Sequence, residues 1–469
     1  MPQWNKEAAF EGRIVMLGFG AVGRAVLPLL LRHLDIGPGQ IEIISPSTKG
    51  IAAADELGVA HAPTRVDRDN YHDLLARRLR AGDFLVNLSV DVSSVALMTW
   101  CLEHDVLYVD ACTEPWPGTY QDKSLPAAQR TNYALREQAL ALREPGRSQC
   151  TALITQGANP GLVSYFVKQA LLDLAGDGAV APGSREGWAR LAQRLDVRTI
   201  HVAEQDSQMS REHKRPDEFV NTWSVGGFVS EGMQPAELGW GTHERHFPSD
   251  GARHASGCRA AIYLERPGAA TRVRSWTPLG GAYQGFLITH AESISIADHL
   301  TVGDVDKPDY RPTVHYAYRP CDDAVLSLHE LEGRQWRMQQ GQRQLREDIM
   351  CGRDELGVLL MGHARGAYWY GSQLTIEQAR ALCPFNSATT LQVAAPIMAG
   401  IAWAIRNPAR GILEPDDLPF DEMLRIIRPY LGDVVGIYSD WTPLDDGCAL
   451  FDVPRDRADP WQFLNFRIT

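Results

Sequence analysis

A glycine pattern near the start of the sequence has the residue types and spacing of a phosphate-binding turn. Residues 14–23 read "IVMLGFGAVG", in which an apolar run precedes Gly18, Gly20 and Gly23. In a G-x-G-x-x-G turn the first glycine permits a tight turn, the second lets a pyrophosphate approach the backbone, and the third lets helix and strand pack closely. The pattern therefore predicts binding of a dinucleotide.

A second stretch combines an aromatic ring with a carboxylate. Residues 221–231 read "NTWSVGGFVSE" and place Trp223 and Glu231 around two adjacent glycines, with Glu204 further upstream. Taken alone, Trp223 is explained by ordinary packing of a half-buried ring at the edge of a core. A binding role for this ring requires a substrate, which the stretch by itself does not supply.

The elements around the glycine pattern support its interpretation. The apolar run 14–17 predicts a strand, and residues 21–34 have helical spacing of apolar side chains with Pro28 as a small kink. A helix that begins at the glycine turn directs its N-terminus at the phosphates. The segments 40–46, 84–90, 92–105 and 106–112 continue as strand, strand, helix and strand. This alternation predicts a parallel sheet of the Rossmann type.

The loops at the carboxyl ends of these strands are the predicted cofactor side, because ligands of parallel sheets bind there. They read "NLSVD" (87–91), "DACTEPW" (110–116) and "QGANPG" (156–161). The position after the second strand, where an acid would select NAD by binding a ribose hydroxyl, is Ser45, so the residues themselves permit NAD or NADP. The candidate cofactor-binding residues are Gly18, Gly20, Ala21, Val22, Gly23, Ser45, Ser47, Asn87, Leu88, Ser89, Asp110, Ala111, Thr113, Asn159 and Pro160.

The sequence pattern changes after about residue 196. Alternating apolar and polar residues there predict a second α+β domain with a largely antiparallel sheet. Residues after 384 are again helical in pattern, and we expect them to pack back on the first domain. We therefore predict an α/β protein with a dinucleotide-binding domain (1–160), a substrate-binding and dimerisation domain (161–383) and a C-terminal helical segment (384–469).

Composition and charge exclude several classes of partner. Apolar residues make up 44% of the 469 residues and charged residues 22%, the net charge is −12, and no run of five Lys or Arg occurs. These values predict a globular protein that binds neither nucleic acid nor a membrane surface, and an acidic chain suits a cationic small ligand. The first residues lack a secretory signal and the eight cysteines form no CxxC pair. We therefore expect a cytoplasmic protein.

Two further motifs have structural interpretations. The apolar stretch 391–405 is interrupted by Gln392 and Pro396 and is shorter than a membrane span, so it predicts a buried helix. The "HERH" motif at 243–246 lacks a third ligand pattern, so we expect surface histidines there and no metal site.

Eight motifs spread along the chain carry a resemblance to a known family. They are "GFGAVGR", "DACTEPW", "QGANPGLVSYFVKQAL", "VAEQDSQ", "NTWSVGGFVSEG", "THAESISIADHL", "DELGVLL" and "PFNSATTLQVAAP". Together they resemble the bacterial homospermidine synthases, in a superfamily similar to saccharopine dehydrogenase. The resemblance implies a homodimer with bound NAD that oxidises putrescine or spermidine to an imine, releases ammonia or diaminopropane, adds a second putrescine and returns the hydride to give homospermidine.

The resemblance also implies the site residues. Positions that match residues of the family's pocket are Glu204, Trp223, Glu231, His290, Glu292 and Asp354, and positions that match residues between cofactor and substrate are Asp91, Glu114 and Asn159. The chemistry agrees, because a diamine with an amine pKa of about 10.4 arrives as a dication that carboxylates hold and an aromatic ring orients. Asn159 would bind an amine or the nicotinamide amide. Taken singly, the carboxylates are explained by capping or solvation and His290 by core packing, and Ser293, Asn386 and Ser387 keep a structural interpretation.

Two other functions stay open. One is a reductase of the saccharopine or carboxynorspermidine type that uses NADPH once per turnover. Its substrate carboxylate would need an arginine in the pocket, and the second domain has arginines such as Arg211, Arg215 and Arg272. The other is a non-catalytic protein that senses the nucleotide and leaves polyamines unchanged.

Overall fold

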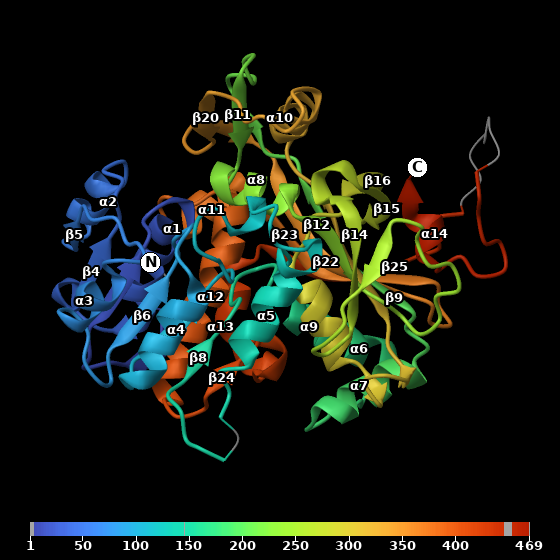
Figure 1. Ribbon diagram of the computed structural model, residues 1–469, viewed down its shortest axis with the longest axis horizontal. Helices are drawn as coiled ribbons and strands as arrows, with labels where there is room; N and C mark the ends of the chain where they lie inside the picture. Colours follow the sequence, from blue (N-terminus) through green and yellow to red (C-terminus); the bar gives the residue numbers. More distant parts are fainter. Residues whose placement is uncertain (1–3, 145, 445–452, 469) are drawn as a thin grey trace.

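Two β-sheets organise the chain, and a computed structural model describes residues 4–144, 146–444 and 453–468 (Figure 1). The parallel sheet lies on the left of Figure 1 and the mixed sheet on the right, with helices between them. This arrangement confirms the predicted fold class, a Rossmann-type domain joined to an α+β domain.

The first sheet has seven strands, and every neighbouring pair in it is parallel. Its inner strands are continuous apolar runs buried on both faces, which is the pattern that parallel sheets require. In sheet order the strands are β24 (Ile412–Leu413), β8 (Ala152–Leu153), β7 (Leu107–Asp110), β6 (Phe84–Asn87), β2 (Ile14–Leu17), β4 (Ile41–Ile44) and β5 (Ala60–Ala62). The helices of this part are α1 (Ala21–His33), α2 (Ile51–Glu56), α3 (Tyr71–Ala76), α4 (Ser94–Glu103) and α5 (Asn132–Leu140).

The second sheet has eleven strands, and among the described residues only the β9–β19 pair is parallel. Its main path is β13 (Gly251–Arg253), β14 (Ala261–Pro267), β12 (Pro235–Gly239), β19 (Thr313–Arg319), β9 (Thr199–Asp206), β22 (Arg353–Met361), β23 (Ala367–Thr375) and β25 (Asp433–Ser439). The strands β15 (Arg272–Thr277), β16 (Gly281–Phe286) and β26 (Arg467–Ile468) extend it beside β19. The predicted antiparallel character is confirmed, because the other strand pairs of this sheet are antiparallel.

Helices and small strand pairs surround the second sheet. The helices are α6 (Leu162–Ala175), α7 (Arg185–Arg194), α8 (Val225–Met233), α9 (Ala291–His299), α10 (Asp322–Gly333), α11 (Ile376–Leu382), α12 (Ala388–Arg406), α13 (Phe420–Ile427) and α14 (Phe463–Phe466). The two-stranded sheets are β1 (Ala8–Ala9) with β3 (Leu34–Asp35), β10 (Met209–Ser210) with β21 (Ile349–Cys351), β11 (Glu218–Asn221) with β20 (Gly341–Gln344), and β17 (Val302–Gly303) with β18 (Pro308–Tyr310).

Helix α12 is the core element that both sheets share. It packs on α1 and β7 of the first sheet and on β22 and β23 of the second. By length and composition α12 could cross a membrane, but 89% of its most apolar window is buried inside the protein. The prediction of a buried helix over this stretch is confirmed.

The last residues correct one expectation. We expected the chain after 384 to be helical and to pack on the first domain. Helix α12 packs on α1 and β7, and β24 joins the first sheet, whereas α13 packs on α12 and α6. Beyond residue 432, however, β25 pairs with β23 and β26 pairs with β15, so the end of the chain completes the second sheet. Strand β25 lies at the edge of the sheet and is only half buried, so its sequence has only a weak alternating pattern. The prediction of a helical segment therefore followed the helical periodicity of the preceding residues.

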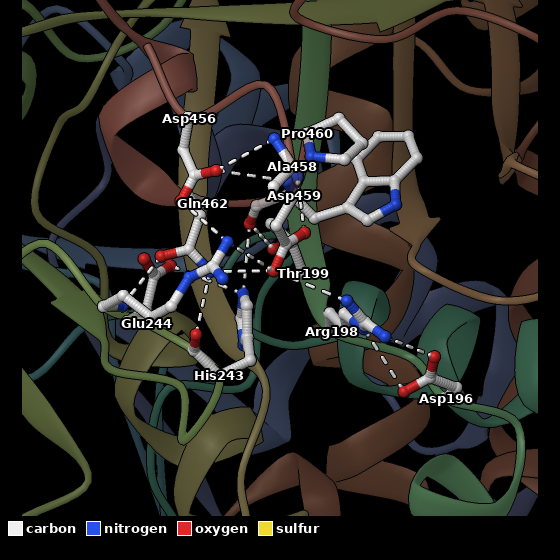
Figure 2. A network of polar contacts seen from close by, with 12 residues as sticks. Asp196, Arg198, Thr199, His243, Glu244, Asp456, Ala458, Asp459, Pro460 and Gln462 are labelled. Atoms are coloured by element: carbon white, nitrogen blue, oxygen red, sulfur yellow. Dashed lines mark hydrogen bonds and ion pairs between the residues drawn. The ribbon is translucent and has the colours of Figure 1, made fainter. Parts of the chain in front are cut away.

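A network of hydrogen bonds connects the C-terminal residues to the second sheet (Figure 2). Gln462 Nε2 donates to the carbonyl oxygen of His243 at 2.8 Å, and Thr199 Oγ1 donates to that of Trp461 at 2.9 Å. His243 Nε2 lies 3.0 Å from the same Trp461 oxygen, and only 13% of its side chain is exposed. The expectation of surface histidines in the HERH motif is therefore wrong for His243, because the C-terminal segment covers it, while His246 is exposed.

Candidate functional site

A cavity of about 350 Å³ lies between the two sheets. Its walls come from the carboxyl ends of β2, β4, β6 and β7, from the start of α8, and from β9, β19 and α12. It brings together these predicted residues: Gly18, Gly20, Ala21, Val22, Ser45, Ser47, Asn87, Leu88, Ser89, Ala111, Glu114, Asn159, Pro160, Glu204, Trp223, Glu231 and His290. Six predicted residues lie outside its walls: Gly23, Asp91, Asp110, Thr113, Glu292 and Asp354.

The glycine turn has the shape that a dinucleotide needs. Gly18 has φ +86°, and a Cβ there would lie 2.5 Å from the carbonyl oxygen of Leu88. Gly20 caps α1, and a Cβ on it would meet nothing within 4 Å. The first turn of α1 has no acidic residue, so its N–H groups face the cavity without a competing carboxylate. The residues present therefore fit a pyrophosphate.

Gly23 serves packing and does not line the cavity. A Cβ at this position would lie 2.6 Å from the carbonyl oxygen of Gly18, so the turn and α1 can approach only with glycine there. At the end of β4, Ser45 and Ser47 line the cavity and Lys49 is exposed, with no carboxylate among the lining residues from this strand end.

The buried side chain of Asp110 lies behind the cavity wall. Asp110 accepts hydrogen bonds from the Thr155 backbone N–H at 2.6 Å and from the Tyr108 hydroxyl at 2.9 Å. Burial raises the pKa of Asp110 to about 7 against these hydrogen bonds, which lower it. The hydroxyl of Thr113 is buried, and no hydrogen-bond partner for it lies among the described residues. Both residues thus sit behind the cavity wall.

Glu204 is a buried carboxylate in the cavity wall. Its Oε2 accepts from Asn159 Nδ2 at 2.8 Å and from the Tyr316 hydroxyl at 2.5 Å. Burial raises the pKa of Glu204 to about 7, with the charge of Asp206 as a further cause. Asn159 comes from the loop after β8 and Glu204 from β9, so this hydrogen bond joins that loop to the second sheet.

Glu114 is a second buried carboxylate in the wall. Burial, followed by the charges of Glu231 and Asp91, raises the pKa of Glu114 to about 8. Asp91 is itself exposed, has φ +63°, and offers its backbone N–H to the Glu114 carboxyl group. With pKa values of about 8 and about 7, Glu114 and Glu204 can both carry a proton near neutral pH.

His290 lies between two carboxylates. Its Nε2 is 3.2 Å from Glu231 Oε2, and its Nδ1 is 3.3 Å from Glu292 Oε1. Burial opposes the charged ring, but Glu292 and then Glu231 outweigh it, so the pKa of His290 is raised well above its usual value. His290 caps α9 and Glu292 stands in the first turn, where the helix N-terminus favours a negative charge.

Trp223 lies in the wall of the cavity and is half-buried. Its Nε1 donates to the Tyr318 hydroxyl at 3.2 Å, and its ring lies 5.4 Å from that of Phe228. A Cβ on Gly227 would lie 3.3 Å from the Trp223 ring, so this glycine gives the ring its room. Ser224 caps α8 through its hydroxyl and fixes the turn that presents the ring.

Asp354 belongs to a buried acidic group behind Glu204. It pairs in register with Asp206 across β22 and β9, and its Oδ2 accepts from the Thr389 hydroxyl at 2.5 Å. Burial, then the charges of Glu204 and Asp206, raises the pKa of Asp354 well above its usual value. Asp354 Oδ1 has no hydrogen-bond partner among the described residues. Burial therefore favours the protonated, neutral form of Asp354 in this acidic group.

Three residues in or beside the cavity are not among those predicted from the sequence: Tyr316, Tyr318 and Asp206. Tyr316 lines the cavity, stacks on Tyr318 with ring centroids 5.1 Å apart, and lies 4.5 Å from the His290 ring. Asp206 accepts from the Thr222 hydroxyl at 2.6 Å beside Asp354. A signal for all three was present: the alternation of β19 puts both tyrosines on one face, and that of β9 puts Asp206 on the face of Glu204.

Comparisons with known proteins define the class of protein. The family described as the saccharopine dehydrogenase NADP binding domain matches residues 14–153, and the saccharopine dehydrogenase C-terminal domain matches residues 157–437. The chain thus has the two-domain organisation of the saccharopine dehydrogenase class.

Full-length relatives narrow the class. Homospermidine synthase of Blastochloris viridis is 52% identical to this chain, in an alignment that covers 99% of each protein. Homospermidine synthase of Mesorhizobium japonicum is 48% identical, in an alignment that covers 99% of this chain and 98% of the relative. The crystal structure of homospermidine synthase from Legionella pneumophila in complex with NAD has a TM-score of 0.91 and 47% identity, over 98% of each chain. The chain belongs to the homospermidine synthase family.

Proposed function

We propose that this protein is an NAD-dependent homospermidine synthase that acts on putrescine, or on spermidine as donor, with putrescine as acceptor. The observation that carries the proposal is the composition of the cavity wall. Three glutamates and the Trp223 ring line it, and no lysine or arginine is among the lining residues in the described part of the chain. Such a wall suits a dicationic amine that reacts beside a dinucleotide.

The acidic wall explains substrate choice. A diamine enters with two ammonium groups, and two carboxylates of the cavity wall hold both of them. We assign these roles to Glu231, beside the His290 imidazolium, and to Glu204, on the strand that also carries Asp206. The arginines weighed for a carboxylate substrate lie elsewhere: Arg215 pairs with Glu212, and Arg272 lies near Glu332.

The reaction needs an amine free of its proton, and Glu204 is placed to take that proton. Its raised pKa puts the ionised and neutral forms close in free energy near neutral pH. Asn159 and Tyr316 orient the accepting carboxylate through their hydrogen bonds. NAD, when bound, supplies hydride acceptance and return, so that no net redox change occurs.

The balance of the reaction is a transfer of one aminobutyl group. The amine-bearing carbon of the donor loses a hydride and its nitrogen loses a proton, which forms an imine. The amine of the second putrescine adds to the imine carbon and ammonia leaves, which forms a second imine. The hydride returns to that carbon, and the nitrogen takes up a proton. If spermidine is the donor, diaminopropane leaves in place of ammonia. Glu114, with its pKa raised to about 8, stands where it can protonate the leaving amine.

Trp223 and His290 orient the cationic species. The face of an indole ring attracts a cation with about 0.5 to 2 kcal/mol, and the hydrogen bond to Tyr318 holds this ring in one orientation. His290, as an imidazolium between Glu231 and Glu292, limits how much negative charge the wall presents. We further propose that the protein is a cytoplasmic homodimer.

Incubation with ¹³C-labelled putrescine and a catalytic amount of NAD tests this function. Mass spectrometry should find homospermidine and an equal amount of ammonia. Accumulation of NADH in proportion to putrescine consumed, without homospermidine, would support a simple dehydrogenase instead. Binding of NAD with putrescine left unchanged would support a nucleotide sensor.

A further inference from the structure

Glu237 is a fully buried carboxylate that lies outside the cavity wall. It stands on β12, six residues after Glu231, and none of its surface is exposed. No arginine or lysine forms an ion pair with it in the described part of the chain; its nearest basic neighbour is His254, with Nε2 3.6 Å from Oε1. A buried carboxylate without a cation must be stabilised by hydrogen bonds, so its donors indicate its role.

The donors come from the other domain and from the residue before His290. The backbone N–H groups of Asn132 and Tyr133, at the start of α5, donate to Oε2 at 2.8 Å and Oε1 at 3.3 Å. The hydroxyl of Thr289 donates to Oε2 at 2.7 Å. Asn132 Nδ2 in turn donates to the Thr289 hydroxyl at 3.3 Å. One carboxylate thereby joins the N-terminus of α5, the strand β12 and the start of α9.

The charge of Glu237 suits this position. Thr131 caps α5 by accepting from Ala134, which leaves the N–H groups of Asn132 and Tyr133 to the carboxylate. A negative charge at a helix N-terminus is stabilised by the aligned peptide dipoles. The helix therefore takes the place of a counterion and anchors Glu237 to the first domain.

Thr289 connects Glu237 to the site, because Thr289 directly precedes His290 in the chain. The imidazole of His290 depends on its backbone position to lie within 3.3 Å of carboxylates on both sides. We propose that Glu237 is a positioning residue that fixes the backbone at Thr289 and His290 against α5, and so holds the His290 ring between Glu231 and Glu292. This proposal rests on the proposed function only for its activity readout.

The test measures His290 directly in the protein without ligands. The groups that face this ring are Glu231 from α8, Glu292 from α9, Glu204 from β9 and Tyr316 from β19. NMR of ¹³Cε1-histidine protein, with the resonance assigned by its loss in His290→Gln, gives the pKa of the ring. In Glu237→Gln and in Thr289→Val the pKa of His290 should fall, because the ring leaves its place between the carboxylates.

Activity provides a second readout with a defined pattern. Glu237→Gln and Thr289→Val should each lower kcat about tenfold, as expected for loss of a hydrogen bond to a charged group, with the KM for NAD within about twofold. The double variant should lose no more than either single variant, because both break the same link. Thr289→Ser keeps the hydroxyl and should restore both the kcat and the pKa of His290.

Two control variants separate positioning from general stability. Glu265→Gln changes an exposed carboxylate on the adjacent strand β14 and should alter nothing. Glu414→Gln weakens the bond from Arg136 of α5 without touching Thr289, so it should lower Tm and leave the pKa of His290 unchanged. An unchanged pKa of His290 in folded Thr289→Val and Glu237→Gln would overturn the proposal. Absence of homospermidine formation by the wild type would overturn the proposed function and leave this result intact.

Discussion

The indole Nε1 of Trp223 donates a hydrogen bond to the hydroxyl of Tyr318 at 3.2 Å. Trp223 belongs to the turn before α8, and Tyr318 to β19, where it stacks on Tyr316. The orientation of the ring in the cavity wall is therefore fixed by the second sheet, which also carries Glu204. A ring held in this way is ready to bind a cation without first losing mobility.

Replacement of the ring tests its role in binding. Trp223→Ala should reduce kcat about ten- to thirtyfold while the fold and NAD binding persist, because a cation–π contact of up to about 2 kcal/mol is removed. Trp223→Phe should keep part of the activity, since a weaker ring quadrupole remains. Steady-state kinetics and thermal melts measure both effects. Trp276→Ala, at a half-buried tryptophan of β15 outside the cavity, is the control. A sharp fall in Tm with normal activity per folded molecule would indicate that Trp223 serves packing only.

The hydrogen bond from Tyr316 predicts a shift in the pH dependence of activity. Glu204 accepts protons only when ionised, so kcat should rise as the pH passes through its pKa of about 7. The Tyr316 hydroxyl lowers that pKa, and Tyr316→Phe should therefore move the rising limb of the pH profile to higher pH. Tyr318→Phe keeps the stacked ring and has no hydrogen bond to Glu204, so it should leave the limb in place. A limb that does not move in Tyr316→Phe would exclude Glu204 as the group that titrates.

The glycines of the turn have separable roles. At Gly20 the backbone has φ −82° and a methyl group would meet no protein atom, so Gly20→Ala should fold normally and weaken NAD binding at least about tenfold by blocking the phosphates. At Gly23 a methyl group would collide with the Gly18 carbonyl, so Gly23→Ala should lower Tm without any ligand. Calorimetric titration with NAD and thermal melts compare the two variants. Equal NAD affinity for Gly20→Ala and the wild type would mean that the dinucleotide binds elsewhere.

Asp110 predicts a pH dependence of stability. Its pKa is raised to about 7 in the folded protein, so between its usual value and 7 the folded state binds more protons than the unfolded state. The contribution of Asp110 to the free energy of unfolding should therefore fall as the pH rises through this range. Asp110→Asn removes the titration, so its stability relative to the wild type should be more favourable at pH 8 than at pH 5. Urea unfolding at both pH values measures the difference, and an equal difference at pH 5 and pH 8 would mean that Asp110 is ionised throughout.

Periodicity was sufficient to predict the parallel sheet. Strands buried on both faces are continuous apolar runs, so β2, β6 and β7 could be predicted from local patterns. The glycine turn after β2 also predicted that the helix α1 follows it. The strands β25 and β26 were not, because their partners β23 and β15 lie far away in the sequence and each is short or half-exposed. Long-range pairing of this kind leaves little local signal.

The site shows the same division. Gly18 is predicted by an unusual local pattern, whereas Trp223 is predicted only by the resemblance of its motif to a known family. Tyr316 and Asp206 act through neighbours on other strands, and a tyrosine on an alternating strand has an ordinary structural explanation until its partner is known. Glu237 depends on a helix of the other domain, a contact that no spacing along the chain encodes.

Transfer of deuterium tests the central claim of a recycled hydride most directly. The protein is incubated with [1,1,4,4-²H₄]putrescine, a catalytic amount of NAD and an excess of unlabelled NADH, and homospermidine is analysed by mass spectrometry. If the hydride taken from the donor returns to the same carbon while NAD stays bound, the product keeps all the deuterium of both putrescine molecules. Homospermidine in which one deuterium is replaced by hydrogen from the unlabelled NADH, or NADH formation without homospermidine, would contradict the account.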